Sequence, residues 1–169
     1  MRVLRPASTP IFGLNMFEAI KAAIANFGLS ESTASRSNQL PEVVTTALLI
    51  RVVAVDAELS ETRYQKLRSV IASTFDLGDE DTSQLILRGT KLAREAVDLY
   101  RFTRQLNQLL DYRGRCHVVR MMWDVVCSDG AANDIEDNFI WRASDLLGVS
   151  TRERVQMRQQ FSRQRALAI

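Results

Sequence analysis

Two stretches of this chain share one pattern and decide its fold: RVVAVDAELSETRYQKL at residues 51–67 and WDVVCSDGAANDIEDNFI at residues 123–140. Setting Asp56 on Asp129 aligns the two stretches. Apolar positions then coincide along the pair, Val53 with Val126 and Leu67 with Ile140. Each copy has the pattern of an apolar helix, an acidic turn centred on an aspartate and a second amphipathic helix. Two such units bury their apolar faces better than one, so we predict an internal pseudo-twofold duplication of this helix–acidic turn–helix unit.

The rest of the chain is also helical in pattern, because apolar residues recur at helical spacing and no window alternates with a period of two. Ser60 precedes one predicted helix as a cap. Two further starts have the spacing of a capping box, Asn133 with Glu136 and Ser150 with Glu153. We therefore predict an all-α fold, a compact bundle of about seven to eight helices. The helices are expected near residues 40–56, 60–75, 79–96, 98–111, 113–128, 133–147 and 150–164, with a short further helix from Met16.

Length and composition predict one domain with flanking segments. The chain has 169 residues, of which 46% are hydrophobic, enough for one sizeable core but not for two. Residues 1–15 lack a periodic apolar face and are expected to form a disordered leader. An N-terminal helix and a Ser/Thr/Asn-rich linker are expected over residues 16–39, the helical domain over residues 40–164, and a tail over residues 165–169.

Charge, hydropathy and cysteine usage favour a cytoplasmic protein. The 22 basic and 20 acidic residues give a net charge of +2, so no global field favours nucleic acid or a membrane surface. The longest apolar run, residues 43–55, is interrupted by Arg51 and is too short to span a bilayer. No signal peptide fits residues 1–15. Helical spacing would hold Cys116 and Cys127 about 16 Å apart, so we expect free thiols in a reducing compartment.

Catalytic machinery is not evident in the sequence. His117 is the only histidine, so neither a catalytic triad nor a histidine-cluster metal site can be assembled from this chain alone. No glycine-rich phosphate loop and no nucleophile with a base beside it occur. The apolar side chains of Met121, Met122 and Trp123 are expected in the core and not around a cofactor. We therefore expect a protein that is not an enzyme.

Two other features are compatible with partner binding. Arg154, Arg158 and Arg165 fall on one face of a basic C-terminal helix, which phosphates or an acidic partner could bind. Aromatic residues are not interleaved there, so a solvated helix is favoured and no nucleic acid is expected. Tyr100 and Phe102 could line a groove for a protein partner, although core packing is favoured for both.

The chain resembles the tellurite-resistance TerB family over about residues 16–160. The resemblance is carried by the two acidic turns and by AREAVDLYRFTRQLN from Ala93, VVRMMWDVVCSDG from Val118 and NFIWRASDLLGVS from Asn138. It implies an all-helical fold with an internal duplication and a role in tellurite and other stress responses. It also implies divalent-metal binding through acidic turns of the form Asp-Gly-Glu-(Ile/Leu), with a further glutamate seven residues after the aspartate.

The first acidic turn keeps two of the three carboxylates that the resemblance implies. Asp56 and Glu58 match the family pattern, but Ala57 replaces the glycine and Arg63 stands where the later glutamate is expected. Because a hard cation such as Ca²⁺ takes about six to eight oxygen ligands, two carboxylates in one turn would form only a weak site.

The second acidic turn has lost a different carboxylate. Asp129 and Glu136 match the family pattern together with Gly130, whereas Ala131 lacks the middle carboxylate. If the predicted packing brings both turns together, they would form one composite site for a divalent cation such as Ca²⁺ or Mg²⁺. The candidate ligands are Asp56, Glu58, Asp129 and Glu136.

A purely structural role for the acidic turns is the alternative. Glu136 already has a role as the reciprocal partner of Asn133 in a capping box, and a helix dipole favours carboxylates near its start. Arg63 could neutralise Asp56 in place of a metal, and we expect Arg63 and Ala131 to be at least partly exposed. Two functions therefore stay open: a stress-response module that binds a divalent cation, and a protein-interaction module of the same fold without a functional metal site.

Overall fold

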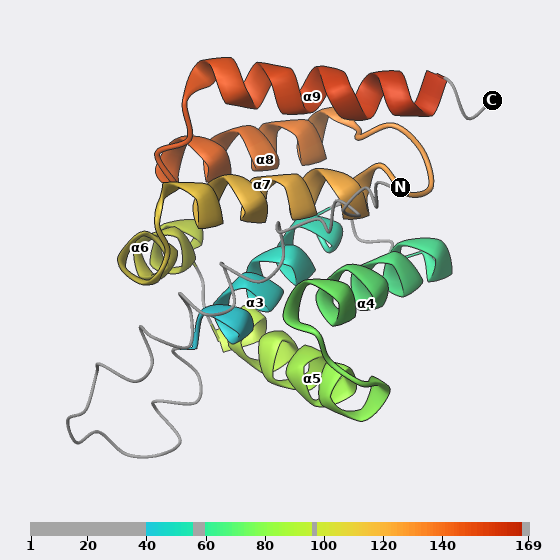
Figure 1. The fold of residues 1–169 in the computed structure, drawn as a ribbon, viewed down its shortest axis with the longest axis vertical. Coiled ribbons are helices and arrows are strands. Elements are labelled where there is room, and N and C mark those ends of the chain that lie inside the picture. Colours follow the sequence, from blue (N-terminus) through green and yellow to red (C-terminus); the bar gives the residue numbers. More distant parts are fainter. Residues whose placement is uncertain (1–39, 56–59, 96–97, 167–169) are drawn as a thin grey trace, which may run out of the picture.

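The computed structural model describes residues 40–55, 60–95 and 98–166, which form helices joined by short connections (Figure 1). Within these residues no strand occurs, and the predicted all-α fold is confirmed. The leader, the helix expected from Met16 and the linker lie outside the described residues. The helices are α3 (Pro41–Val53), α4 (Glu61–Phe75), α5 (Asp79–Glu95), α6 (Leu99–Leu109), α7 (Tyr112–Val126), α8 (Asp134–Leu146) and α9 (Thr151–Ala166).

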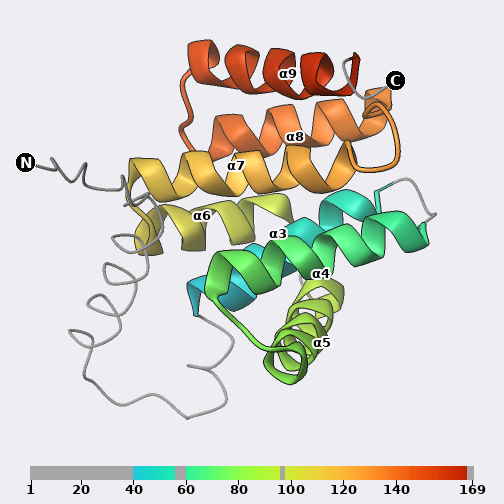
Figure 2. The same cartoon turned by 45° about the vertical axis from the view of Figure 1, so that its right-hand side comes forward.

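Helix α3 lies at the centre of the fold and contacts α4, α5, α6, α7 and α8. Its sequence is apolar on nearly every side, which is typical of a helix buried all round. Side chains from Val43 to Val53 are accordingly almost all buried. Figures 1 and 2 show α7, α8 and α9 side by side in one half of the molecule, with α4 and α5 packed around α3 in the other half. No helix in the described part of the chain is both long and apolar enough to cross a membrane.

The predicted core of α7 is confirmed. Met121, Met122 and Trp123 are all buried, with Trp123 only 4% exposed. The expectation of core packing was right for Phe102, which is buried, and wrong for Tyr100, which is 55% exposed on α6.

Local capping explains where α4 and α8 begin. The hydroxyl of Ser60 accepts a hydrogen bond from the backbone N–H of Arg63 at 3.2 Å. The side chain of Asn133 accepts from the backbone N–H groups of Ile135 and Glu136 at 3.0 and 2.9 Å. In return, the Glu136 carboxylate accepts from the Asn133 N–H at 3.0 Å, so the predicted capping box is confirmed. These bonds satisfy N–H groups that the first turn of a helix leaves unpaired.

The capping box predicted before α9 forms only in part. The Ser150 hydroxyl accepts from the Glu153 N–H at 3.3 Å, as predicted. The Ser150 N–H, however, donates to the hydroxyl oxygen of Tyr112 at 3.2 Å instead of to Glu153. The Glu153 carboxylate accepts from the hydroxyls of both Ser150 and Tyr112, so the start of α9 is tied to the start of α7.

The basic face predicted on α9 is not simply solvated. Arg154 is buried: its guanidinium forms an ion pair with Asp145 at 3.1 Å and stacks over the Trp141 ring with its central carbon 4.6 Å from the centroid. Arg158 stays largely exposed and pairs with Asp137 at 2.8 Å. The expectation of a solvated helix was therefore wrong for Arg154, because a neighbouring helix supplies an aromatic face that covers its guanidinium.

The helix bounds agree with the repeat pattern. Arg63 in α4 and Glu136 in α8 lie 73 positions apart, which is also the separation between Asp56 and Asp129 in the alignment of the acidic turns. Helices α3 and α4 correspond in order and position to α7 and α8. The internal duplication itself stays a prediction.

Candidate site at the acidic turns

The second acidic turn lies against the start of α4. Asp129 follows α7 in the turn that leads to α8, and Glu136 is the third residue of α8. The Glu136 side chain is fully buried, whereas that of Asp129 is 26% exposed. Both carboxylates bind Arg63 in the first turn of α4. Asp56 and Glu58, the other two predicted ligands, lie outside the described residues.

The guanidinium of Arg63 spans the two carboxylates. Its Nε donates to Asp129 Oδ1 at 2.7 Å. Its Nη1 binds Glu136 Oε1, and its Nη2 donates to Glu136 Oε2 at 3.3 Å. The contact with Glu136 is therefore bidentate, the arrangement that matches a planar guanidinium to a carboxylate. We call the three residues Arg63, Asp129 and Glu136 the Arg63 clasp.

The one carboxylate oxygen that does not bind Arg63 also has a protein donor, and Glu136 Oε2 has a second donor. The Ser60 hydroxyl donates to Asp129 Oδ2 at 2.6 Å, and the Asn133 N–H donates to Glu136 Oε2 at 3.0 Å. All four carboxylate oxygens therefore accept at least one hydrogen bond from the protein. Such saturation is required of a buried carboxylate, because burial without partners is costly.

Electrostatics favour the charged forms of Arg63 and Asp129. Burial works against the charge of Arg63, but its hydrogen bonds to Asp129 and Glu136 and their negative charges outweigh that effect and raise its pKa. Partial burial likewise tends to raise the pKa of Asp129. The hydrogen bonds from Ser60 and Arg63, with the positive charge of Arg63, lower it below its ordinary value. Arg63 and Asp129 are both ionised at neutral pH.

The expectation that Arg63 is partly exposed was wrong. Arg63 is buried and its side chain is only 10% exposed, because it enters the space between α4 and the turn before α8. Ala131 is exposed, as expected. The sequence did not predict that Arg63 binds Asp129 and Glu136, although one signal was present. In the predicted repeat, Arg63 and Glu136 fall on equivalent positions with opposite charges, and equivalent positions meet where a pseudo-twofold pair packs about its axis.

A divalent cation requires several ligand side chains gathered at one point. Within the described residues, no group of three or more His, Cys, Asp or Glu side chains gathers closely enough to hold a metal ion. Of the four candidate ligands, the structure brings Asp129 and Glu136 together, and it does so through Arg63. The complete site with Asp56 and Glu58 stays a prediction.

The helical bundle, with Arg63 bound to Asp129 and Glu136 beside the turn between α7 and α8, defines the molecule as a small all-helical module. The family described as "Tellurite resistance protein TerB" matches residues 42–159, most of the described chain, and the protein belongs to this family. The resemblance carried by the acidic turns and by the α6 to α8 segments is thereby confirmed. Neither a curated protein nor a solved structure matched the chain. Family membership makes the protein a tellurite-resistance-related module.

Proposed function

We propose that this TerB-family protein is a non-enzymatic module that binds a protein partner and that uses the Arg63 clasp in place of a resident divalent cation. One observation carries the proposal: a guanidinium lies between Asp129 and Glu136, two of the carboxylates that the family pattern assigns to a metal. The positive charge that these carboxylates need is thus supplied by the chain itself.

Competition with Arg63 explains why a cation would bind poorly here. A hard divalent cation requires about six to eight oxygens with lone pairs directed at it. In the Arg63 clasp every oxygen of Asp129 and Glu136 already accepts a hydrogen bond. A cation would have to displace the guanidinium, and Arg63 would then be left buried without its counter-ions, which is strongly unfavourable.

Exposed apolar side chains support a protein partner. Leu87 on α5, Tyr100 on α6 and Ile135 at the start of α8 are each more than half exposed, at 65%, 55% and 54%. Large apolar and aromatic side chains at the surface are what a protein partner covers. We propose a cytoplasmic location for this activity, because Cys116 and Cys127 lie too far apart along α7 to form a disulfide with each other and suit a reducing compartment.

Calorimetric titration tests the cation part of the proposal. The protein should show no saturable heat with Ca²⁺, Mg²⁺, Mn²⁺ or Zn²⁺, and the matched variant Asp129→Asn should behave identically. Saturable heat in the wild type that disappears in Asp129→Asn would contradict the proposal.

A divalent-cation module is the second candidate function, and one contact favours it. Ser60 directly follows the first acidic turn in sequence, and its hydroxyl lies 2.6 Å from Asp129 Oδ2. Ser60 thus places the start of α4 beside the second acidic turn. This candidate predicts saturable heat with Ca²⁺ or Mg²⁺ that both Asp56→Asn and Asp129→Asn remove.

Cross-linking in cells tests the partner. We expect a defined partner to be captured equally well in the presence of Ca²⁺ and of a chelator, since no resident cation takes part. Tyr100→Glu and Leu87→Glu each place a charge at an exposed apolar position, and the variant that reduces the capture identifies the contact face. A complex that forms only with added divalent cation would favour the second candidate.

A further inference from the structure

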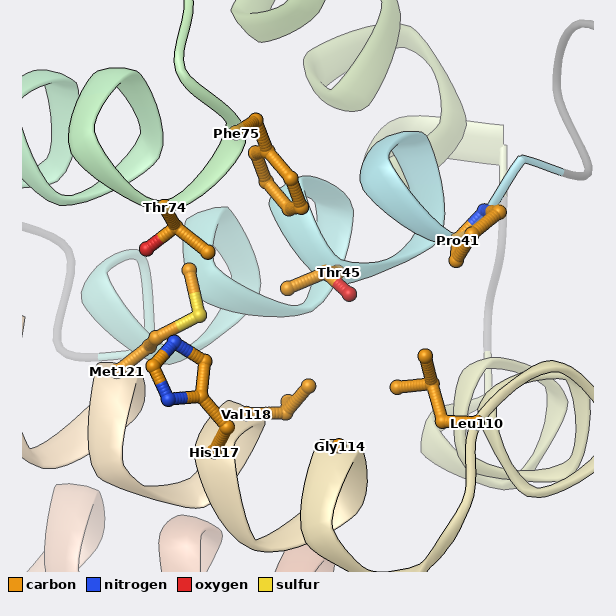
Figure 3. Close-up of a pocket in the computed structure, with 9 residues that line it drawn as sticks. All are labelled: Pro41, Thr45, Thr74, Phe75, Leu110, Gly114, His117, Val118 and Met121. Atoms are coloured by element: carbon orange, nitrogen blue, oxygen red, sulfur yellow. The ribbon is translucent and has the colours of Figure 1, made fainter. Parts of the chain in front are cut away.

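A small pocket lies where α3, α4 and α7 meet, close to the end of α6 (Figure 3). Its lining is almost wholly apolar and includes Phe75 of α4, with the threonines Thr45 and Thr74 at its sides. Two longer side chains of α7, His117 and Met121, also line the pocket (Figure 3). The cavity measures about 10 Å³, which is room for one water-sized species.

His117 presents a nitrogen without a partner. Its Nε2 is buried and, within the described residues, forms no hydrogen bond. Burial lowers the pKa of His117, and the nearby charge of Arg120 lowers it further, so the imidazole is neutral at pH 7. A neutral imidazole carries one proton and one lone pair. With the proton on Nδ1, the lone pair of Nε2 is free to bind a ligand.

Met121 places a second potential ligand atom, its thioether sulfur, on the same helix face. Residues four positions apart in a helix lie one above the other, and His117 and Met121 have this spacing on α7. Met121 is buried, at 3% exposure, and it lines the same pocket as the imidazole. Figure 3 shows both side chains extending from successive turns of α7 toward Thr74. The pocket therefore combines a thioether sulfur with an unpaired imidazole nitrogen.

We propose that His117 and Met121 bind a soft monovalent cation, Cu(I) or Ag(I), through Nε2 and the thioether sulfur. Thioether ligands select Cu(I), and imidazole also suits copper. Both ions accept low coordination numbers, so two protein ligands are sufficient. Binding involves no electron transfer, because the cation enters and leaves in the monovalent state.

The surroundings of the pocket disfavour other cations. No carboxylate lines it, so a hard cation would lack its oxygen ligands. Zn²⁺ requires about four ligands, and the described residues gather no three His, Cys, Asp or Glu side chains at one point. The positive charge of Arg120, one turn along α7, repels a divalent cation more strongly than a monovalent one. The site is also independent of the Arg63 clasp, since Arg63 and Thr74 lie about 16 Å apart along α4.

Titration of the full chain with Ag(I), a redox-stable probe for Cu(I), tests this site by NMR. We expect the methyl signal of Met121 and the ring signals of His117 to shift together and saturate at one equivalent. Met121→Leu preserves side-chain volume and should weaken Ag(I) binding at least about tenfold. Met122→Leu is the matched control: Met122 is equally buried on α7 but does not line the pocket, so its substitution should leave the affinity unchanged.

The thiols of the two cysteines are competing soft ligands for Ag(I). A second variant distinguishes binding to them from binding at His117 and Met121. Cys116→Ala with Cys127→Ala should retain the coupled shifts of His117 and Met121. Binding that is lost in the cysteine variant and unchanged in Met121→Leu would overturn the proposal in favour of thiol binding. Absence of any shift at Met121, with each variant folded by circular dichroism, would show that the pocket holds water only and would also overturn it.

Discussion

Arg63 is a buried cation whose counter-ions come from another part of the chain. It lies in the first turn of α4, and it binds Asp129 and Glu136, which are 66 and 73 positions away in sequence. A buried ion pair contributes modestly to net stability, but removing one partner leaves the other charge buried and unpaired. Glu136 is fully buried, so the cost of leaving its charge unpaired is the dominant effect of any substitution at Arg63 on stability.

Arg63→Ala should lower the free energy of unfolding by about 3–5 kcal/mol, because Glu136 would stay buried without its guanidinium. Chemical denaturation at neutral pH measures this loss. Lys66→Ala is the matched control on the same helix. Lys66 pairs with Asp124 at 3.0 Å, but both side chains are more than a third exposed, so the control should cost less than about 1 kcal/mol. Equal and small losses in the two variants would show that the Arg63 clasp adds little.

His117 should make stability depend on pH. Its pKa is lowered in the folded protein by burial and by Arg120, so below about pH 6.5 the unfolded chain binds a proton more readily than the folded one. The neutral, buried imidazole therefore leaves the folded protein fully stable above that pH. This stability is lost as the pH falls.

Denaturation of the wild type and of His117→Gln between about pH 7.5 and pH 5.5 tests this dependence. The wild type should lose stability over this range, and the glutamine variant should lose less, because it cannot take up a proton. Parallel curves for the two proteins would mean that His117 titrates equally in both states.

At the scale of single residues, local rules predicted caps but not long-range partners. The capping box of Asn133 and Glu136 lies within four consecutive residues, so its spacing was sufficient to predict it. Arg154 was expected in solvent because aromatic residues are not interleaved with the arginines of its own helix. Its burial depends on Trp141, which reaches it only after α8 and α9 pack. The Arg63 clasp depends on tertiary packing in the same way.

At the scale of helices, the sequence predicted α3 to α9 within about three residues at each end. Helical periodicity and caps are local signals, and they agree with the bounds that the structure shows. Which helix faces which neighbour is not a local property. The close approach of α3 and α5 therefore required the structure, and it depends on Gly89.

Gly89 allows α5 to pack closely on α3. A Cβ at this position would lie 2.6 Å from Cγ2 of Thr46 and 3.2 Å from the backbone nitrogen of Ala47. Gly89→Ala should destabilise the protein by about 1–3 kcal/mol through overpacking, although alanine is the better helix former by about 1 kcal/mol. Gly78 is the control, since a Cβ there would meet nothing within 4 Å.

Thermal unfolding of Gly89→Ala and Gly78→Ala measures the difference. The melting temperature should fall for Gly89→Ala and change little for Gly78→Ala. A rise for Gly89→Ala would mean that α3 and α5 separate easily and that helix propensity outweighs their packing.

At the scale of the whole molecule, the Arg63 clasp joins the two halves of a TerB-family fold. It connects the start of α4 in one half with the turn between α7 and α8 in the other. The family pattern places a metal at such turns, and here an arginine supplies the positive charge. We therefore propose that the folded state is complete without a divalent cation.

Thermal unfolding of the wild type with millimolar Ca²⁺ or Mg²⁺, compared with a chelator, tests this claim most directly. A cation that binds only the folded state raises the melting temperature by mass action. The Arg63 clasp predicts the same melting temperature with Ca²⁺, with Mg²⁺ and with the chelator. A rise of several degrees with either cation, absent in Asp129→Asn, would contradict the claim.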